Sequence, residues 1–147
     1  MENEMKLLIE HANITVGSTE EAMRFLGTAF PDFKVRGKGF LGGGESAGTW
    51  THYGNDETYL ALQENAASSG RSDVTYTNDG INHMGFVIEE MDALVTRMAD
   101  EGYHPSDASA MDGHPYRRRA YFKDKNGFEW EFVEYLSDIS SERNHYG

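Results

Sequence analysis

Two segments of the chain are similar to each other, IEHANITV at positions 9–16 and INHMGFVI at positions 81–88. They align without gaps, and each carries one histidine at the same place, His11 and His83. Both segments are short and rich in apolar and β-branched residues, which is typical of buried strands. The repetition predicts two copies of one structural module, each beginning with this strand.

A helical pattern follows each predicted strand. Ser18 to Glu21 form a capping box, in which a hydroxyl side chain precedes a carboxylate by three positions. Apolar residues then recur at helical spacing, at positions 22, 25, 26 and 29 and again at positions 91, 94, 95 and 98. Gly102 fits the left-handed position at which a helix ends. We therefore predict one helix in each module.

The remaining patterns predict further strands, at positions 32–36, 49–53, 58–64, 116–123 and 128–135. Asn126-Gly127 predicts a two-residue hairpin turn between the last two strands. The chain is thus expected to be a single α+β domain, 1–147, of two βαβββ modules whose sheets form an open, barrel-like cleft. Module 1 spans about 5–65, a polar linker about 66–79, module 2 about 80–136, and a polar tail 137–147 lies on the surface or on a partner subunit.

Composition excludes several classes of protein. Hydrophobic residues make up 38% of the 147 residues, enough for a packed core, and a net charge of −12 repels nucleic acid and anionic membrane surfaces. The chain has no cysteine, so any metal ion must be held by His, Asp and Glu. Charged residues interrupt the N-terminal segment, and no apolar stretch reaches the length of a membrane span. We therefore expect a cytoplasmic protein that binds neither nucleic acid nor membranes.

The two repeated histidines are the strongest functional signal. A single histidine in an apolar strand usually has a structural role, but equivalent side chains converge when two modules pack about a pseudo-two-fold axis. Glu131, between Trp130 and Phe132, is a candidate third ligand because a buried carboxylate needs a partner. The alternative is that Glu129 and Glu131 line a solvated face of a strand whose aromatic residues face the core.

The order of elements, the two His-bearing strands and the segment YFKDKNGFEWEF at 121–132 resemble the vicinal oxygen chelate superfamily. That superfamily includes glyoxalase I, extradiol dioxygenases, fosfomycin-resistance proteins and bleomycin-binding proteins. The resemblance extends from about Lys6 to Tyr135. It implies metal ligands at His11, His83 and Glu131, a divalent ion (Fe, Mn, Ni or Zn), a small-molecule substrate and a homodimer, with the site formed within one chain or between two.

The resemblance implies a metal-dependent enzyme whose substrate chelates the ion through adjacent oxygens, with lyase, transferase or dioxygenase chemistry. Glyoxalase I takes a fourth ligand, a glutamate, from the last strand of its first module. Here Ala61 aligns with Glu131, and only a slip of two residues would bring in Gln63. This departure argues against glyoxalase activity. The alternative function is a metal-free small-molecule or antibiotic-binding protein like the bleomycin-resistance members.

Residues that contact the substrate are predicted less directly. Across a two-residue Asn126-Gly127 turn, Phe122 pairs with Glu131, which places Phe122 and Arg118 on the side of the site and Tyr121 on the other side. Arg118 could then clamp an anionic group, although a run of three arginines is more commonly a solvated face. Gln63 and His52 complete the candidate set. His104, His114 and His145 have no repeat partner and are interpreted as surface or loop residues.

Two glycine-containing motifs match patterns of other functions. Gly44 to Gly48 matches the G-x-S-x-G pattern of serine hydrolases, with Ser46 as nucleophile, and Gly37 to Gly42 matches a dinucleotide fingerprint. The first has a run of glycines before it and a predicted strand after it, instead of the strand and helix that its chemistry requires, and no helix begins after the second. A mobile glycine-rich loop is the preferred interpretation of both.

Overall fold

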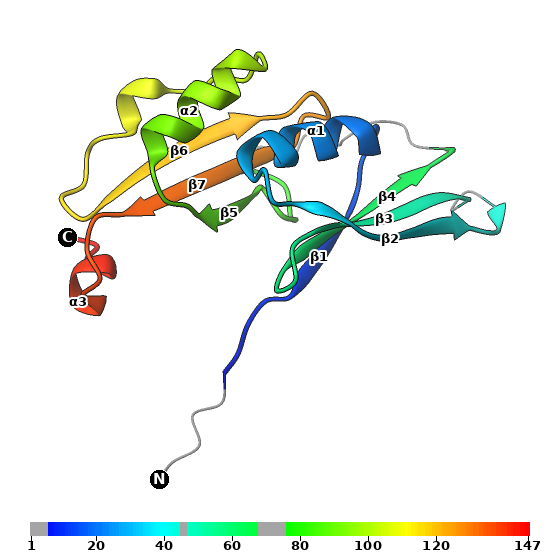
Figure 1. Cartoon of the computed structure of the whole chain (residues 1–147), viewed down its shortest axis with the longest axis horizontal. Coiled ribbons are helices and arrows are strands. Elements are labelled where there is room, and N and C mark those ends of the chain that lie inside the picture. Colours follow the sequence, from blue (N-terminus) through cyan, green and yellow to red (C-terminus); the bar gives the residue numbers. More distant parts are fainter. Residues whose placement is uncertain (1–5, 45–46, 68–75) are drawn as a thin grey trace, which may run out of the picture. The chain divides into compact units, whose positions relative to one another are not determined.

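A computed structural model describes residues 6–44, 47–67 and 76–147 of the chain. The chain divides into two compact units, Met1–Gly70 and Arg71–Gly147. The elements of the first unit follow the order of the first predicted module (Figure 1). They are β1 (His11–Thr15), α1 (Thr19–Ala29), β2 (Lys34–Leu41), β3 (Gly48–Gly54) and β4 (Tyr59–Asn65).

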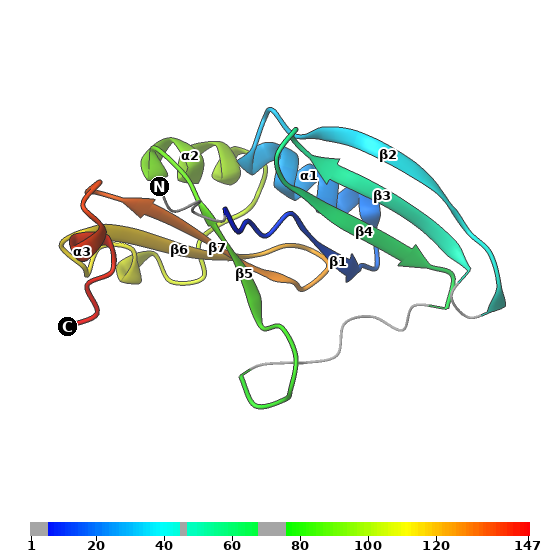
Figure 2. The same cartoon turned by 90° about the horizontal axis from the view of Figure 1, so that it is seen from below.

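The first unit is a four-stranded sheet with one helix on one face. The strand order is β1-β4-β3-β2, with β1 parallel to β4 and the other pairs antiparallel. Figure 2 shows α1 lying along the sheet. Phe25 and Leu26 of α1 and Leu60 and Leu62 of β4 are fully or almost fully buried. They form the core between helix and sheet, and among the described residues of this unit no helix covers the opposite face.

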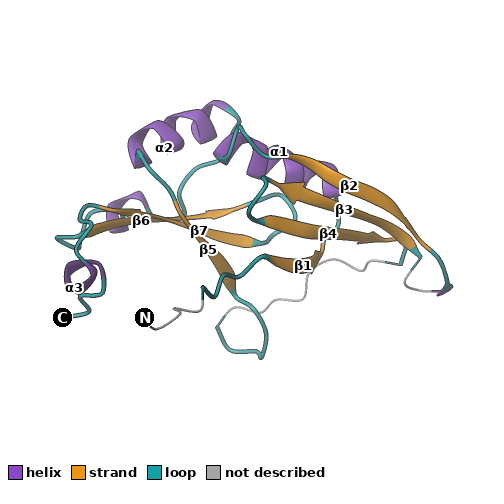
Figure 3. Ribbon diagram, turned by 60° about the horizontal axis from the view of Figure 1, so that its bottom comes forward, coloured by secondary structure: helices purple, strands orange, loops and turns teal. Residues whose placement is uncertain are grey.

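The second unit repeats this plan with one strand fewer. It contains β5 (His83–Val87), α2 (Met91–Asp100), the 3-10 helix η2 (Ala108–Ala110), β6 (Arg117–Lys123), β7 (Glu129–Tyr135) and α3 (Ser140–Arg143) (Figure 3). Its sheet has the order β5-β7-β6, with β5 parallel to β7. The α+β class is confirmed, and neither sheet closes on itself.

The fourth strand expected in the second module is replaced by an irregular segment between α2 and β6. This segment shares isolated backbone hydrogen bonds with β6: Ser106 N donates to Tyr121 O (2.7 Å), and Arg119 N donates to Met111 O (3.3 Å). It contains Pro105 and Pro115. Because proline has no backbone N–H to donate to a ladder, these residues disfavour a regular strand.

The parallel strand pairs of the two units have the same register. His11 lies opposite Tyr59 in the first unit, and His83 lies opposite Glu129 in the second. Two residues further along, Ala61 and Glu131 therefore occupy equivalent positions. This confirms the predicted alignment, in which the first module has no carboxylate where the second has Glu131.

The hairpin between β6 and β7 differs from the prediction. Asp124 N donates to Phe128 O and Gly127 N donates to Asp124 O, which leaves a three-residue loop. Only Gly127 has a positive φ, 83°, as in a turn that ends in a glycine bulge. The extra loop residue shifts the register by one, so Glu131 pairs with Tyr121, and Phe122 pairs with Trp130. The predicted pairing of Phe122 with Glu131 was wrong.

A strand carboxylate holds the first turn of each helix. Thr19 N donates to Glu64 Oε2 (2.7 Å) at the start of α1, and Met91 N donates to Glu134 Oε2 (3.2 Å) at the start of α2. The predicted Ser18 cap is confirmed, since Ser18 Oγ accepts from Glu21 N. The α2 helix has no such side-chain cap. Its first turn therefore depends more strongly on the strand carboxylate.

The C-terminal tail packs on its own unit. Arg117 Nη1 donates to the carbonyl oxygens of Arg143 (3.1 Å) and His145 (3.2 Å). The guanidinium of Arg143 lies 4.2 Å from the centre of the Tyr135 ring. These contacts fix α3 beside the end of β7 (Figure 1). In the described part of the chain, no helix has the length and apolar character needed to cross a membrane.

Candidate metal centre

One face of the second sheet gathers the ionisable groups of the candidate site. The alternation of side chains along each strand places His83, Glu129 and Glu131 on this face, together with Tyr121. Trp130 and Phe132 point to the other face and are fully buried against α2. The predicted alternation, with the aromatic residues toward the core and the glutamates on the other face, is therefore confirmed. The glutamate side chains are only 16% and 13% exposed, however, and Glu131 has the partner that a shielded carboxylate needs.

His83 and Glu131 are in direct contact. The Nε2 atom of His83 lies 3.1 Å from Oε2 of Glu131, and the two side chains are 27% and 13% exposed. Two ligands bound at right angles, each about 2.1 Å from an ion, are about 3 Å apart. The two atoms are within hydrogen-bond distance of each other, and the same separation would suit neighbouring ligands of one divalent ion. A Cβ at Gly85 would lie 3.7 Å from Glu131 Oε2, so glycine leaves room beside the carboxylate.

Two groups form only part of a metal site. Within residues 6–44, 47–67 and 76–147, no three His, Asp or Glu side chains are arranged to hold a metal ion. An imidazole and a carboxylate are, however, two of the three ligands in a two-histidine, one-carboxylate triad. His83 and Glu131 match the donor chemistry of two members of such a triad. The second histidine of the repeat, His11, belongs to the first unit.

The other nitrogen of His83 also faces a carboxylate. Nδ1 lies 3.7 Å from Glu129 Oε1 and 3.4 Å from the Tyr76 hydroxyl. That hydroxyl donates a short hydrogen bond of 2.6 Å to the same Glu129 oxygen. This bond is the main cause that raises the pKa of Tyr76 to about 12. Tyr76 thus stays protonated and holds the Glu129 carboxylate in place.

Tyr121 completes this face of the site. Its ring lies edge-on to the His83 imidazole, with 5.3 Å between ring centres. Burial, with a smaller contribution from the negative charge of Glu131, raises the pKa of the Tyr121 hydroxyl. The side chain is therefore a neutral hydrogen-bond donor beside Glu131. The register predicted from the sequence placed it on the wrong face.

His11 lies on the uncovered face of the first sheet. Its ring stacks on Tyr59, with 4.7 Å between centres and 13° between planes, and its Nδ1 is 2.9 Å from Glu10 Oε1. The hydrogen bond with His11 is the largest cause that lowers the pKa of Glu10. His52 stacks on the same Tyr59 ring at 4.6 Å. Gln63 shares this face and donates to Asn65 Oδ1 (3.0 Å).

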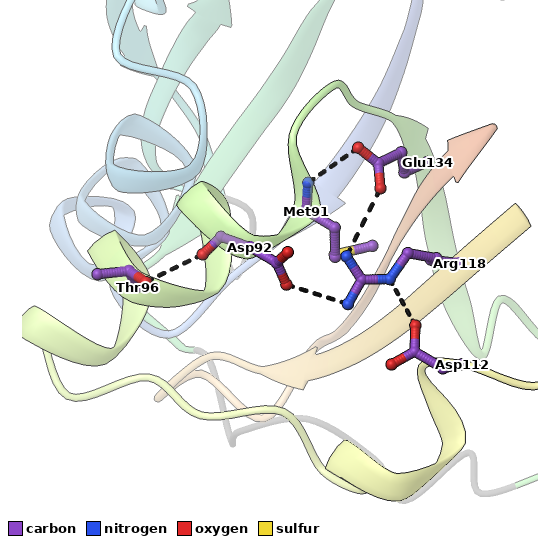
Figure 4. A network of polar contacts seen from close by, with 6 residues as sticks. All are labelled: Met91, Asp92, Thr96, Asp112, Arg118 and Glu134. Carbon is purple, nitrogen blue, oxygen red and sulfur yellow. Dashed lines mark hydrogen bonds and ion pairs between the residues drawn. The ribbon is translucent and has the colours of Figure 1, made fainter. Parts of the chain in front are cut away.

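Arg118 and Phe122 lie on the opposite face of the second sheet from Glu131, contrary to the prediction. Phe122 is fully buried. Arg118 binds carboxylates from three parts of its own unit: Asp92 of α2 (3.0 Å), Asp112 (2.5 Å) and Glu134 of β7 (3.7 Å) (Figure 4). The hydrogen bonds with Asp92 and Asp112 raise the already high pKa of the guanidinium. Arg118 therefore ties α2 to the sheet.

Several residues around the histidines were not predicted from the sequence. Tyr76 falls in the polar linker, where no spacing signal relates it to His83. Glu10 and Glu129 adjoin candidate ligands, and the tendency of metal-bound histidines to donate to carboxylates could have pointed to them. The proposed hydrolase nucleophile, Ser46, lies outside the described residues.

A model of the Glyoxalase/Bleomycin resistance protein/Dioxygenase superfamily matches residues 8–132. The chain belongs to this superfamily. A comparison with curated proteins gives no match.

Solved structures of superfamily proteins have a similar fold. A glyoxalase family protein from Bacillus cereus has a TM-score of 0.72 and 16% identity, over 93% of this chain and 100% of that chain. The trypanothione-dependent glyoxalase I of Leishmania major has a TM-score of 0.65 and 20% identity, over 88% and 87%. The fosfomycin resistance protein FosX of Listeria monocytogenes, complexed with Mn(II) and sulfate, has a TM-score of 0.61 and 17% identity, over 96% and 99%. At these identities the similarity concerns the fold.

Proposed function

We propose that this protein is a divalent-metal-dependent enzyme acting on a small substrate that chelates the ion through adjacent oxygens. The observation that carries the proposal is the contact between His83 Nε2 and Glu131 Oε2 at 3.1 Å on an open sheet face. Membership of a superfamily with an Mn(II)-bound structure supports it. Fe, Mn, Ni and Zn are the candidate ions.

We assign the ligands to His11, His83 and Glu131. His11 occupies the same place in its strand pair as His83, which supports a common function for the two side chains. A bound ion would supply Lewis acidity to the substrate oxygens. The neutral hydroxyl of Tyr121, beside Glu131, is placed to donate a hydrogen bond to an oxygen of the substrate. The hydrogen bond between Tyr76 and Glu129 fixes the position of the carboxylate beside His83.

Lyase, transferase or dioxygenase chemistry is favoured over the glyoxalase I reaction. Ala61 stands at the position equivalent to Glu131, so the first module offers no carboxylate there to move a proton. Gln63 is on the same face, and its amide can accept or donate hydrogen bonds but is no base. We also propose a homodimer, which sedimentation or light scattering would test.

The test is the metal content of the protein. Wild type is reconstituted with Fe(II), Mn(II), Ni(II) or Zn(II), and bound metal per chain is measured by plasma mass spectrometry beside His83→Ala, Glu131→Ala and His11→Ala. His104→Ala is the matched control, because His104 is an exposed histidine of the second unit. Near-stoichiometric metal that is lost in the three ligand variants and kept in the control is expected.

Tight metal binding would justify a screen of catechols, epoxides and hemithioacetals as substrates. Wild-type protein that binds none of the four ions would contradict the enzyme proposal. It would favour the alternative function, a metal-free small-molecule-binding protein. Retention of metal by His11→Ala alone would remove His11 from the ligand set.

A further inference from the structure

The two repeated histidines have matching surroundings at Nδ1. In the second unit, Nδ1 of His83 is within hydrogen-bond distance of the Tyr76 hydroxyl (3.4 Å), which donates to Glu129 Oε1 (2.6 Å), and that carboxylate oxygen lies 3.7 Å from Nδ1. In the first unit, Nδ1 of His11 faces Glu10 Oε1 (2.9 Å), and this oxygen accepts the Tyr59 hydroxyl (3.4 Å). Beside Nδ1 of each histidine there is thus a carboxylate that accepts a hydrogen bond from a tyrosine hydroxyl.

The two sets arise from different parts of the chain. Glu10 precedes its histidine directly, whereas Glu129 comes from the neighbouring strand. Tyr59 lies opposite His11 in β4, and Tyr76 lies ahead of β5. Strand repetition does not by itself produce this agreement, since the residues are not at equivalent positions. A shared requirement of the two imidazoles explains it better.

A neutral imidazole has one N–H donor and one acceptor nitrogen, and the bond made by one nitrogen determines the state of the other. At His11 the group that Nδ1 meets is a carboxylate, which can only accept. At His83 it is a tyrosine hydroxyl whose own hydrogen is already donated to Glu129, so both surroundings favour the tautomer with the proton on Nδ1. Nε2 is then left with its lone pair, which is the form that binds a metal ion.

We infer that Glu129 with Tyr76, and Glu10 with Tyr59, are positioning pairs that hold His83 and His11 with Nδ1 as donor and Nε2 free for the ion. The inference rests on the proposed function. In the second unit Nε2 lies 3.1 Å from Glu131 Oε2, so an ion bound by both atoms would take the place of a proton shared between them, while Nδ1 would keep its own proton. None of the four positioning residues needs to touch the substrate.

The pair in the second unit is expected to have the larger effect. The side chain of Glu129 is 16% exposed, whereas that of Glu10 is 62% exposed. Water competes for an exposed carboxylate and screens its charge, which reduces the contribution of Glu10 despite its shorter contact with Nδ1, 2.9 Å against 3.7 Å for Glu129. Loss of a carboxylate behind a ligating histidine typically weakens metal binding by about 10–100-fold. We expect Glu129→Ala to fall in this range and Glu10→Ala near or below its lower end.

The tautomer is measured without metal, by long-range 1H–15N correlation spectra in alkaline buffer, where free imidazole is neutral. Glu131→Ala is the reference protein for His83, because it lacks the opposing carboxylate that would otherwise bind a proton on Nε2. His83 is expected with its proton on Nδ1 in this protein and with a substantial Nε2–H population when Glu129→Ala is added. Wild type serves directly for His11, compared with Glu10→Ala.

The metal affinity is measured in proteins that retain Glu131, by Zn(II) or Mn(II) titration of wild type, Glu129→Ala, Glu129→Gln and Tyr76→Phe. The amide introduced by Glu129→Gln keeps an acceptor oxygen, so this variant should restore most of the tautomer preference and affinity that Glu129→Ala loses. Tyr76→Phe should give an intermediate loss. Glu89→Ala removes an equal charge from an exposed position of the same unit and should change neither readout.

The inference is overturned if His83 carries its proton on Nε2 in the reference protein, or if Glu129→Ala changes neither tautomer nor affinity while its circular dichroism is unchanged. Failure of the proposed function has a separate signature, the absence of metal binding in wild type. The tautomer spectra need no metal, so they decide the positioning role even in that case.

Discussion

The strand carboxylate Glu134 is predicted to stabilise the start of α2 more than its counterpart Glu64 stabilises α1. Glu134 accepts from Met91 N and lies 3.7 Å from Arg118 Nη1, with both side chains 18% exposed. In α1 the first turn has the Ser18 side chain as a second acceptor. The α2 helix begins instead at Glu90, which has a φ of 57° and makes no side-chain cap bond.

The magnitudes follow from these contacts. Loss of an N-cap acceptor costs about 0.5–2 kcal/mol, and a hydrogen bond to a charged group contributes about 1.5–3 kcal/mol. Glu134→Ala loses a charged acceptor at a helix with no other side-chain cap, so a loss of about 2 kcal/mol is expected. Arg118 keeps Asp92 and Asp112, whose exposed carboxylates add little. Glu64→Ala should cost about 1 kcal/mol, because Ser18 remains.

The assay is urea denaturation followed by far-ultraviolet circular dichroism, with hydrogen exchange of the first-turn amides of α2 as the local measurement. Glu134→Gln keeps an acceptor oxygen and should lose about half as much stability as Glu134→Ala. The exchange of the Met91 amide should accelerate in Glu134→Ala. A Glu134→Ala protein that is no less stable than Glu64→Ala, with unchanged exchange at Met91, would refute the reasoning.

Three further predictions concern packing and pH. Phe122→Ala should lower the free energy of unfolding in urea by about 3–5 kcal/mol, because Phe122 is buried in the core. Tyr121→Phe, at the adjacent position on the other face, should lower it by under about 1 kcal/mol. The reverse order would support the strand register predicted from the sequence. Gly27→Ala should destabilise α1 despite better helix propensity, since its Cβ would lie 2.5 Å from the Tyr53 hydroxyl, and adding Tyr53→Phe should recover the loss. Burial raises the pKa of Tyr53 above 10.0, so the folded state keeps this proton longer than the unfolded state. The stability from this group is complete below about pH 10 and falls as the pH rises further; Tyr53→Phe should make that fall shallower in denaturation curves at increasing pH.

The features that the sequence predicted well are those with local causes. The strand containing His11, the strand containing His83, and the helices that follow them depend on short-range patterning and capping. The Ser18 cap and the left-handed Gly102, with a φ of 88°, lie where the pattern placed them. The alignment of Ala61 with Glu131 also followed from the repeat, because equal strands pair in equal register.

The features that the sequence missed depend on a single residue of loop length or on contacts between distant segments. Asn126-Gly127 signals a hairpin equally well with two or three loop residues, and Asp124 decides between them. Its carboxylate accepts from Phe128 N (2.9 Å) and from Trp130 Nε1 (3.0 Å). These bonds hold the longer loop, and the strand period of two then moves each side chain of β6 to the other face.

The register error placed the wrong residues of β6 beside the candidate site but did not affect the contact between the candidate ligands His83 and Glu131. Glu131 is on β7, whose pairing with β5 does not pass through the hairpin, so its contact with His83 is independent of the turn. Arg118 and Tyr121 are on β6, which the turn positions, and they exchanged faces. The residues that the two parallel strands share could therefore be predicted from the repeat. Those that the hairpin brings to the same face required the structure, and Tyr121 is the residue gained in this way.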